Sequence, residues 1–293
     1  DHVGFPGSAG GWWIGLSLLH TLFIKEHNTI CDRLQQLYPD WDDSQLFDKA
    51  RLINAALLAK IHTVEWTPAI LPKPATQIAM NANWWGLLGK EVKEITGSIG
   101  DSEILSGIVG SQTDHHAAPY YLTEEFVSVY SMHPLIPDEM TFYYLYFLRS
   151  LMKDGSIKPF DLAAFDILRD RERGVPRYNR FREIVGRGRV HTFDSLTSNR
   201  QWAKELREVY NNDIDSVDLM VGLFAEDLPE GFGFSDTAFR VFILMASRRL
   251  KSDRFFTTDY RAEIYTQLGL DWIDNNSFLT VLRRHYPALS PAL

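Results

Sequence analysis

Apolar side chains recur at helical spacing along almost the whole chain, and this feature limits the fold most strongly. One such set lies near the start of the chain, and its successive members are three, four or seven residues apart: Leu16, Leu19, Phe23, Ile30, Leu34 and Leu37. Such spacing places side chains on one face of an α-helix, and no segment shows the alternation of a half-buried strand. The sequence therefore predicts a mainly α protein, organised as a single partial domain over residues 1–293.

Polar residues and prolines indicate where the predicted helices begin and end. Asp42 and Gln45 form a capping pair before the second helix. Thr123 and Ser235 are each followed by acidic residues, which are favoured in the first turn of a helix. Pro68, Pro72 and Pro74 are expected to end the second helix, and Pro68 favours an end at Trp66–Thr67.

Composition excludes several classes of protein. Acidic residues outnumber basic ones by 38 to 30, giving a net charge of −8, so no nucleic-acid partner is expected. Cys31 is the only cysteine, which excludes an intrachain disulfide and a cysteine-based metal cluster. No apolar run has the length of a transmembrane helix. The compartment is unknown, and a cytoplasmic or peripheral-membrane location is the working hypothesis. Contact with either a membrane surface or a lipid body is left open.

The histidines are the first candidates for chemistry. Nucleophile elbows, phosphate-binding glycine loops and paired metal histidines at helical spacing are missing from the sequence. Tyr130 precedes His133 by three residues, which on a helix places phenol and imidazole on one face. Packing explains most Tyr-x-x-His pairs, so the spacing alone leaves a structural role open.

Longer motifs give this pair a context. Residues 130–138 resemble the segment of cyclooxygenases and alpha-dioxygenases that carries the radical tyrosine and the proximal haem histidine. Residues 23–28 and 169–179 resemble blocks of animal-type haem peroxidases, whereas 59–67 and 245–256 resemble alpha-dioxygenases specifically. The blocks occur in the family's order. The chain thus resembles the C-terminal portion of a fatty-acid alpha-dioxygenase of the peroxidase–cyclooxygenase superfamily, and a helical haem-peroxidase catalytic domain is the implied fold.

The resemblance implies a haem enzyme that acts on long-chain fatty acids and dioxygen in lipid metabolism and oxylipin biosynthesis. His133 would bind the iron of haem b, and the Asn179 carbonyl would accept the imidazole N–H and orient it. Tyr130 would become a tyrosyl radical, which removes hydrogen from the carbon alpha to the carboxylate. Dioxygen would then add there to give a 2-hydroperoxy fatty acid. For Asn179 the alternative is a loop residue that caps backbone groups.

Oxidation at the alpha carbon requires a site for the carboxylate, and the resemblance assigns it to His62, Thr67 and Arg249. Arginine binds a carboxylate through two parallel hydrogen bonds. Arg248 is the rival assignment, and a salt bridge at a helix end is the alternative role for either arginine. His62 and Thr67 are about 140° apart on an ideal α-helix. They are expected to converge only if the helix ends at Trp66–Thr67.

The chain departs from the family pattern in two ways. The distal haem histidine, its glutamine neighbour and the calcium-binding loop lie upstream of the matched region, so calcium is left open for a longer parent. The stretch 138–160 is shorter than in relatives. Alternatives are therefore another superfamily oxygenase or peroxidase, such as a linoleate dioxygenase, and a non-catalytic haem- or lipid-binding fragment.

Overall fold

The computed structural model describes residues 14–86, 88–91, 123–130 and 162–292. They belong to two compact units, Asp1–Pro119 with Arg249–Leu293, and Tyr120–Arg248. Every regular element in the described ranges is a helix. The prediction of a mainly α protein is therefore confirmed. His133 lies outside the described residues, and the side chain of Arg248 is not described.

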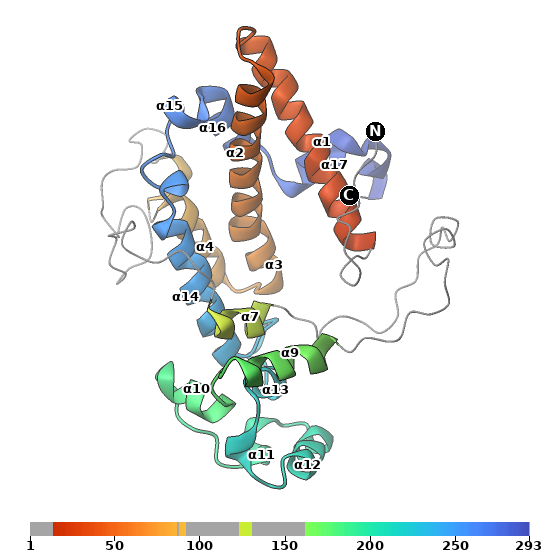
Figure 1. The fold of residues 1–293 in the computed structure, drawn as a ribbon, viewed down its shortest axis with the longest axis vertical. Coiled ribbons are helices and arrows are strands. Elements are labelled where there is room, and N and C mark those ends of the chain that lie inside the picture. The colour runs from red at the N-terminus through yellow and green to blue at the C-terminus, as the bar shows by residue number, and fades with distance from the viewer. Residues whose placement is uncertain (1–13, 87, 92–122, 131–161, 293) are drawn as a thin grey trace. The chain divides into compact units, whose positions relative to one another are not determined.

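The first unit is built around an antiparallel pair, α1 (Ile14–Leu37) and α2 (Asp43–Ile61) (Figure 1). The helix α16 (Gln267–Asn275) packs against α2, and α17 (Phe278–His285) packs against α1. The other elements of this unit are η1 (His62–Trp66), α3 (Thr67–Ile70), α4 (Pro74–Trp85), η4 (Arg254–Phe256), α15 (Ala262–Tyr265) and η5 (Pro287–Ala292).

The buried face of α1 differs from the predicted one. Leu22, Glu26, Ile30 and Leu34 are buried at steps of four, whereas Leu16, Leu19 and Leu37 are exposed. The apolar residues of α1 cover more than one face, and only the face against α2 and α17 is buried. Packing partners, rather than spacing alone, therefore decide which stripe forms the core.

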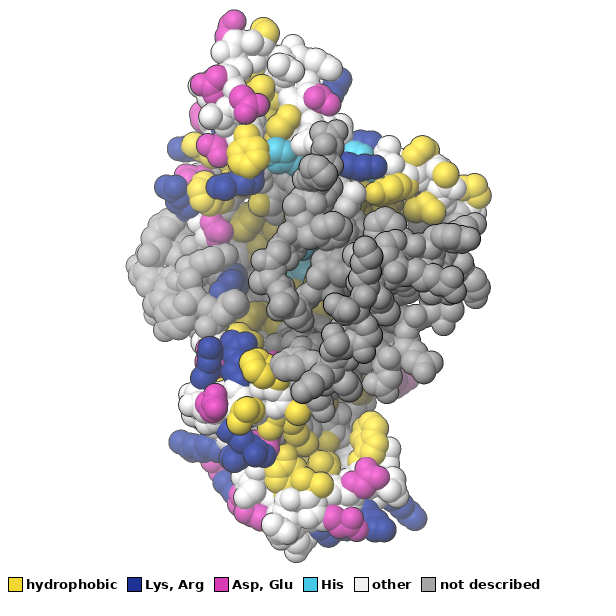
Figure 2. Space-filling view, turned by 45° about the vertical axis from the view of Figure 1, so that its right-hand side comes forward, with side chains coloured by type: hydrophobic (Ala, Val, Ile, Leu, Met, Phe, Trp, Pro, Cys, Tyr) yellow, Lys and Arg dark blue, Asp and Glu magenta, His cyan; other side chains and the backbone are white. Residues whose placement is uncertain are grey.

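The second helix begins as predicted. The Asp42 side chain accepts from the Gln45 N–H at 2.8 Å, and the Gln45 side chain accepts from the Asp42 N–H at 3.0 Å. Exposed carboxylates gather at this end of the helix pair, where Figure 2 shows them in magenta; they belong to Asp32, Asp40, Asp42, Asp43 and Asp48. The carboxylates of Asp42 and Asp43 are stabilised there by the positive end of the α2 dipole.

The second unit consists of short helices. They are α7 (Glu124–Tyr130), α9 (Leu162–Glu172), α10 (Tyr178–Ile184), α11 (Phe193–Leu196), α12 (Arg200–Val209), η3 (Ile214–Ser216), α13 (Leu219–Ala225) and the greater part of α14 (Asp236–Ser252). The predicted starts of α7 and α14 are confirmed, since Thr123 and Ser235 accept from the N–H groups of Phe126 and Ala238, each at 3.3 Å.

A buried aspartate joins several segments of this unit. Asp218 accepts two hydrogen bonds from the Arg171 guanidinium, at 2.9 and 2.6 Å, and one from the Tyr210 hydroxyl at 2.9 Å. Arg177 pairs with the same carboxylate. A buried charge is tolerated when it is paired and hydrogen-bonded in this way. The network holds α9 and the start of α10 to the segment before α13.

No described helix combines the length and the apolar character that crossing a membrane requires.

Candidate functional site

The chain does not leave the helix at Trp66–Thr67. Instead α2 passes into the π-helical turn η1, and the helix continues as α3 with Pro68 in its first turn. A proline lacks the N–H group and its ring collides with the carbonyl four residues earlier in an α-helix, here that of Val64. The π turn directly before Pro68 is a departure from α-helical bonding at this point. The predicted helix end was therefore wrong, and a π turn stands in its place.

This turn brings together two of the predicted site residues. In η1 the Thr67 N–H donates to the His62 carbonyl, five residues earlier. This π-helical bonding brings residues i and i+5 onto neighbouring positions of successive turns, whereas an α-helix places them on different faces. The Thr67 hydroxyl also donates to the His62 carbonyl, at 2.8 Å. The backbone N–H and the hydroxyl of Thr67 thus both contact the backbone carbonyl of His62, in a widened helical turn rather than at a helix end. The convergence of the two side chains on a carboxylate stays a prediction. Single π turns are common at functional sites.

The imidazole of His62 lies in an apolar setting. Its ring stacks on Trp66, with centroids 4.7 Å apart and planes 23° apart. Burial disfavours the charged ring and lowers the pKa of His62 from its usual value of 6.5. At neutral pH the ring is therefore uncharged, with one N–H donor. An anion that binds beside it would gain a hydrogen bond and would favour protonation of the ring.

The lowered pKa of His62 predicts a specific pH dependence of stability. Between pH 6.5 and the lower folded-state pKa, the unfolded chain binds more protons at this residue than the folded chain. The free energy of unfolding should therefore fall as the pH falls through this window. His62→Gln should reduce that loss, which urea unfolding at pH 7.5 and 5.5 would measure. His191→Gln, at an exposed position, is the control; an equal effect from both substitutions would contradict the prediction.

Thr67 is almost fully buried, at 1% exposure. Its hydroxyl proton is engaged with the His62 carbonyl, so it would have to release this bond in order to donate to a carboxylate. The backbone contact therefore fixes the position of the side chain and leaves its oxygen as an acceptor. Among the three residues predicted to bind the substrate carboxylate, Thr67 has a hydroxyl whose observed hydrogen bond, to the His62 carbonyl, competes with donation to the substrate.

Arg249 lies near the end of α14 and belongs to the same compact unit as His62 and Thr67. Its side chain is half-buried. The choice between Arg249 and Arg248 stays open, because the Arg248 side chain is not among those described.

Tyr130 is the last residue of α7 and lies between two aromatic rings of its own unit. Phe126 stacks on it with centroids 5.1 Å apart, and Phe242 of α14 with centroids 5.9 Å apart and planes 8° apart. Phe234 and Phe239 extend the stack beyond Phe242. The tyrosine is 40% exposed, and desolvation raises its pKa above 10. The phenol therefore keeps its proton at neutral pH.

Asn179 is buried in α10 and holds a neighbouring loop. Its carbonyl accepts from the Val190 N–H at 2.8 Å, and its amide donates to the Val190 carbonyl at 2.8 Å and to Asp215 at 2.7 Å. This matches the alternative role of a residue that caps backbone groups. The amide oxygen has a second lone pair, so the predicted contact with His133 stays a prediction.

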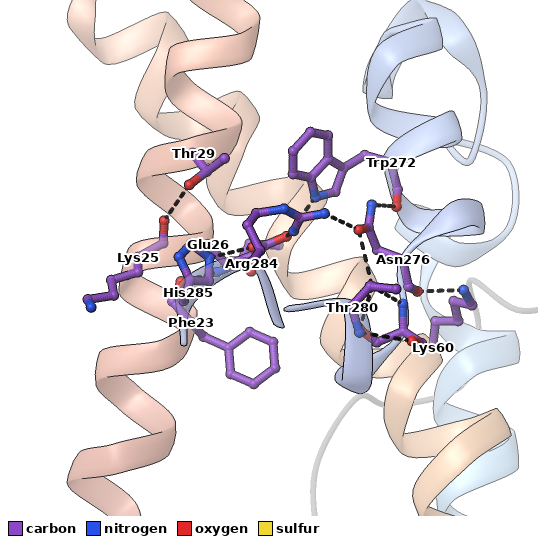
Figure 3. Close-up of polar contacts among 12 residues, drawn as sticks. Phe23, Lys25, Glu26, Thr29, Lys60, Trp272, Asn276, Thr280, Arg284 and His285 are labelled. Atoms are coloured by element: carbon purple, nitrogen blue, oxygen red, sulfur yellow. Dashed lines mark hydrogen bonds and ion pairs between the residues drawn. The ribbon is translucent and has the colours of Figure 1, made fainter. Parts of the chain in front are cut away.

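The first unit contains a buried polar network that none of the predicted site residues belongs to. Glu26 is fully buried and accepts from Trp272 Nε1 at 2.9 Å, lies 2.7 Å from His285 Nε2 and pairs with Arg284, as Figure 3 shows. Glu26 belongs to the block at 23–28, but only its burial in α1 shows that it has a structural role. The sequence signal for this role is that Glu26 stands at helical spacing among apolar residues that form the buried face of α1, since a glutamate is rarely buried unless it is paired.

Metal-binding groups are sparse in the described residues. Within them, no cluster of three or more His, Cys, Asp or Glu side chains could hold a metal ion. A haem iron requires only one or two protein ligands, and an imidazole nitrogen is a usual one. The predicted ligand, His133, lies just beyond α7, outside the described residues.

A family model for the animal haem peroxidases matches the chain over residues 6–146 and 143–292. Alpha-dioxygenase 2 of Arabidopsis thaliana is 38% identical over 355 aligned positions, which cover 99% of this chain and 56% of the relative. Alpha-dioxygenase PIOX of Oryza sativa is 36% identical, covering 98% of this chain and 57% of the relative. The chain therefore spans about half the length of these curated relatives.

Solved structures give the same picture. The crystal structure of Oryza sativa fatty acid alpha-dioxygenase superposes with a TM-score of 0.84 at 36% identity, over 95% of this chain and 56% of that chain. A tyrosine-to-phenylalanine variant of the same rice protein with palmitic acid gives a TM-score of 0.83, again at 36% identity, over 95% and 56% of the two chains. Peroxidase A of Dictyostelium discoideum, at 22% identity and a TM-score of 0.58 over 92% of this chain and 54% of that chain, shares the fold.

Proposed function

Because the chain belongs to the animal haem peroxidase family, we propose that it carries the substrate carboxylate site and the radical tyrosine of a fatty-acid alpha-dioxygenase. The product would be a 2-hydroperoxy fatty acid. The observation that carries this proposal is the π turn, which stacks His62 and Thr67 within the block that resembles alpha-dioxygenases. The similarity to fatty acid alpha-dioxygenases along nearly the whole chain supports the same function.

The carboxylate would be held at the α2–α3 junction. The uncharged His62 ring offers one N–H, and Arg249 offers a charged pair of donors with the geometry of a carboxylate. Thr67 would donate once its hydroxyl has turned from the His62 carbonyl. Palmitic acid, present with the rice variant, is the model substrate. The head of the acid would thereby be fixed, so that the alpha carbon is the position presented for attack.

Tyr130 would perform the hydrogen transfer. On oxidation the phenol loses one electron and its proton, and the resulting phenoxyl oxygen takes a hydrogen atom from the alpha carbon. Dioxygen adds to the carbon radical, and the peroxyl radical takes a hydrogen atom back from Tyr130. One C–H bond is broken, one C–O bond and one O–H bond are formed, and the tyrosyl radical is regenerated. Phe126 and Phe242 hold the ring on either side during these steps.

The family implies haem, which supplies the oxidising equivalent that generates the tyrosyl radical; we propose haem b. His133 would bind the iron, three residues beyond Tyr130. The described residues that precede His133 in sequence fit such a cofactor, because Tyr130, the last residue of α7, stacks with Phe126 and Phe242, and an aromatic, apolar environment suits a porphyrin. Asn179 would contribute the second lone pair of its carbonyl.

Arg249→Ala is the test of the carboxylate site. Loss of a charge-assisted contact in a buried site typically costs about 2–5 kcal/mol. The apparent KM for palmitate should therefore rise roughly tenfold or more, and products oxidised away from carbon 2 should appear. Oxygen uptake and mass spectrometry of products, measured on the haem-loaded chain, would give both values.

Two comparisons make this test decisive. Methyl palmitate should be a poor substrate of the unmutated chain, because its head group lacks the charge that Arg249 pairs with. Arg249→Lys should retain part of the affinity, since it keeps the charge but loses the bidentate geometry. If Arg248→Ala alters affinity and regiochemistry while Arg249→Ala does not, the site is assigned to the wrong arginine. If the ester is oxidised as well as the acid, no carboxylate site operates.

A further inference from the structure

Lys60 and Glu65, which flank His62 in sequence, both contact residues 273–278, where α16 ends and α17 begins. This segment is called the α16–α17 corner. Lys60 is buried, at 5% exposure, and its ammonium donates to the carbonyls of Ile273, Asp274 and Asn276 at 2.9, 3.1 and 2.8 Å. These carbonyls close the C-terminal end of α16, where orphan acceptors and the negative end of the helix dipole favour a cation. Figure 3 shows Lys60 pointing at the segment with Asn276.

Glu65 binds the other side of this corner. Its carboxylate accepts from the Phe278 N–H at 2.9 Å, in the first turn of α17. An anion is favoured at this end of a helix, because the first N–H groups have no partner within the helix and the dipole is positive there. The positively charged Lys60 therefore binds the negative, C-terminal end of α16, and the negatively charged Glu65 binds the positive, N-terminal end of α17. Both contacts join residues more than 200 positions apart in sequence.

We propose that Lys60 and Glu65 are positioning residues, which clamp the π turn onto the α16–α17 corner and thereby set the placement of His62 and Thr67. The consequence for substrate binding rests on the carboxylate site proposed above. In an uninterrupted α-helix, residues 60 and 65 would be about 140° apart, so both could not reach one corner. The extra residue of the π turn reduces this angle and lets both contacts form.

Pro68 alone does not explain the placement of the turn. It requires a departure from α-helical bonding at the carbonyl of Val64, but it does not specify in which turn the extra residue lies. The contacts of Lys60 and Glu65 fix the position of the extra residue between them, because Lys60 binds before the π turn and Glu65 binds within it. Relaxation of η1 to an α-helix would break one of the two contacts and leave a buried charge or a backbone N–H without its partner.

The corner itself is a firm anchor. Asn276 donates to the Trp272 carbonyl at 2.7 Å, and its own side-chain carbonyl accepts from Thr280 at 3.3 Å and from Arg284. Arg284 in turn pairs with the buried Glu26 of α1 (Figure 3). Side chains from α1, α16 and α17 thus fix the corner from which the π turn is held.

The experiment uses the whole 293-residue chain with Lys60→Met and Glu65→Ala, each with a matched control. Lys49→Met is the control for the lysine, because Lys49 also lies on α2 and donates to a distant carbonyl, that of Ile264. Glu65→Gln is the conservative variant, since its amide oxygen can still accept from Phe278. The first readout is the titration of His62, followed by NMR of chains labelled in histidine and assigned with His62→Gln. The second is the affinity for palmitate.

Lys60→Met and Glu65→Ala should return the His62 titration towards pH 6.5 and weaken palmitate binding by roughly tenfold, the effect of one lost hydrogen bond to a charged group. Lys49→Met and Glu65→Gln should leave the titration unchanged. An unchanged His62 titration in both Lys60→Met and Glu65→Ala, whatever their stability, would overturn the clamp. If one of these two variants fails to fold, the titration in the other decides alone: a shift supports the clamp and an unchanged value overturns it. A shifted titration with unchanged palmitate affinity would uphold the clamp and instead refute the proposed carboxylate role.

Discussion

Replacement of Tyr130 by phenylalanine is expected to abolish fatty-acid oxygenation while the fold and haem content are retained. The substitution removes only the phenol oxygen and its hydrogen. The ring that Phe126 and Phe242 enclose is unchanged in volume, so the stack should persist. Without an O–H bond to break and reform, no hydrogen atom can be taken from the alpha carbon. Oxygen uptake with palmitate should fall to the level of haem alone.

A matched control is available in the same unit. Tyr210→Phe also removes one hydroxyl, which donates to Asp218 at 2.9 Å, and it should lower stability without abolishing oxygen uptake. The electron paramagnetic resonance spectrum after addition of peroxide gives a second readout, since the tyrosyl signal should be lost in Tyr130→Phe alone. Retained palmitate oxidation in Tyr130→Phe would show that another residue transfers the hydrogen.

The second large effect is expected from His133→Ala, which should remove the haem. Two of the described histidines are engaged elsewhere: His62 stacks on Trp66 in the π turn, and His285 lies against the buried Glu26. His133 follows Tyr130, the predicted radical tyrosine, by three residues in the segment that resembles the family's proximal-ligand block. Loss of the predicted proximal ligand should eliminate the Soret band and the stoichiometric haem content after purification.

Substitution of a histidine at another position provides the control for this variant. His27→Ala, on the half-buried face of α1, should keep a normal Soret band. Added free imidazole should partly restore haem binding in His133→Ala, because it can occupy the space of the missing ligand. An unchanged haem band in His133→Ala would assign the iron to a different residue.

The sequence by itself determined the helical class, the family and the local signals at helix starts. Capping at Asp42 and at Thr123 depends on residues three positions apart, and helical spacing depends on neighbours within one turn, so these features are encoded locally. The motif blocks identified the resemblance to alpha-dioxygenases, which the comparisons confirm. They also nominated His62, Thr67, Tyr130, Asn179 and Arg249, whose roles stay predictions.

Only the tertiary structure decided how several of these residues are held. The buried stripe of α1 is selected by α2 and α17, and Asn179 is bound to Val190 and Asp215, which spacing cannot reveal. The prediction from Pro68 was right that α-helical bonding fails, and wrong that the helix ends there. The π turn persists because Lys60 and Glu65 meet a corner more than 200 residues away in sequence. Hydrogen bonds over such separations form only when the chain has folded, and they set the geometry that local propensity leaves undetermined.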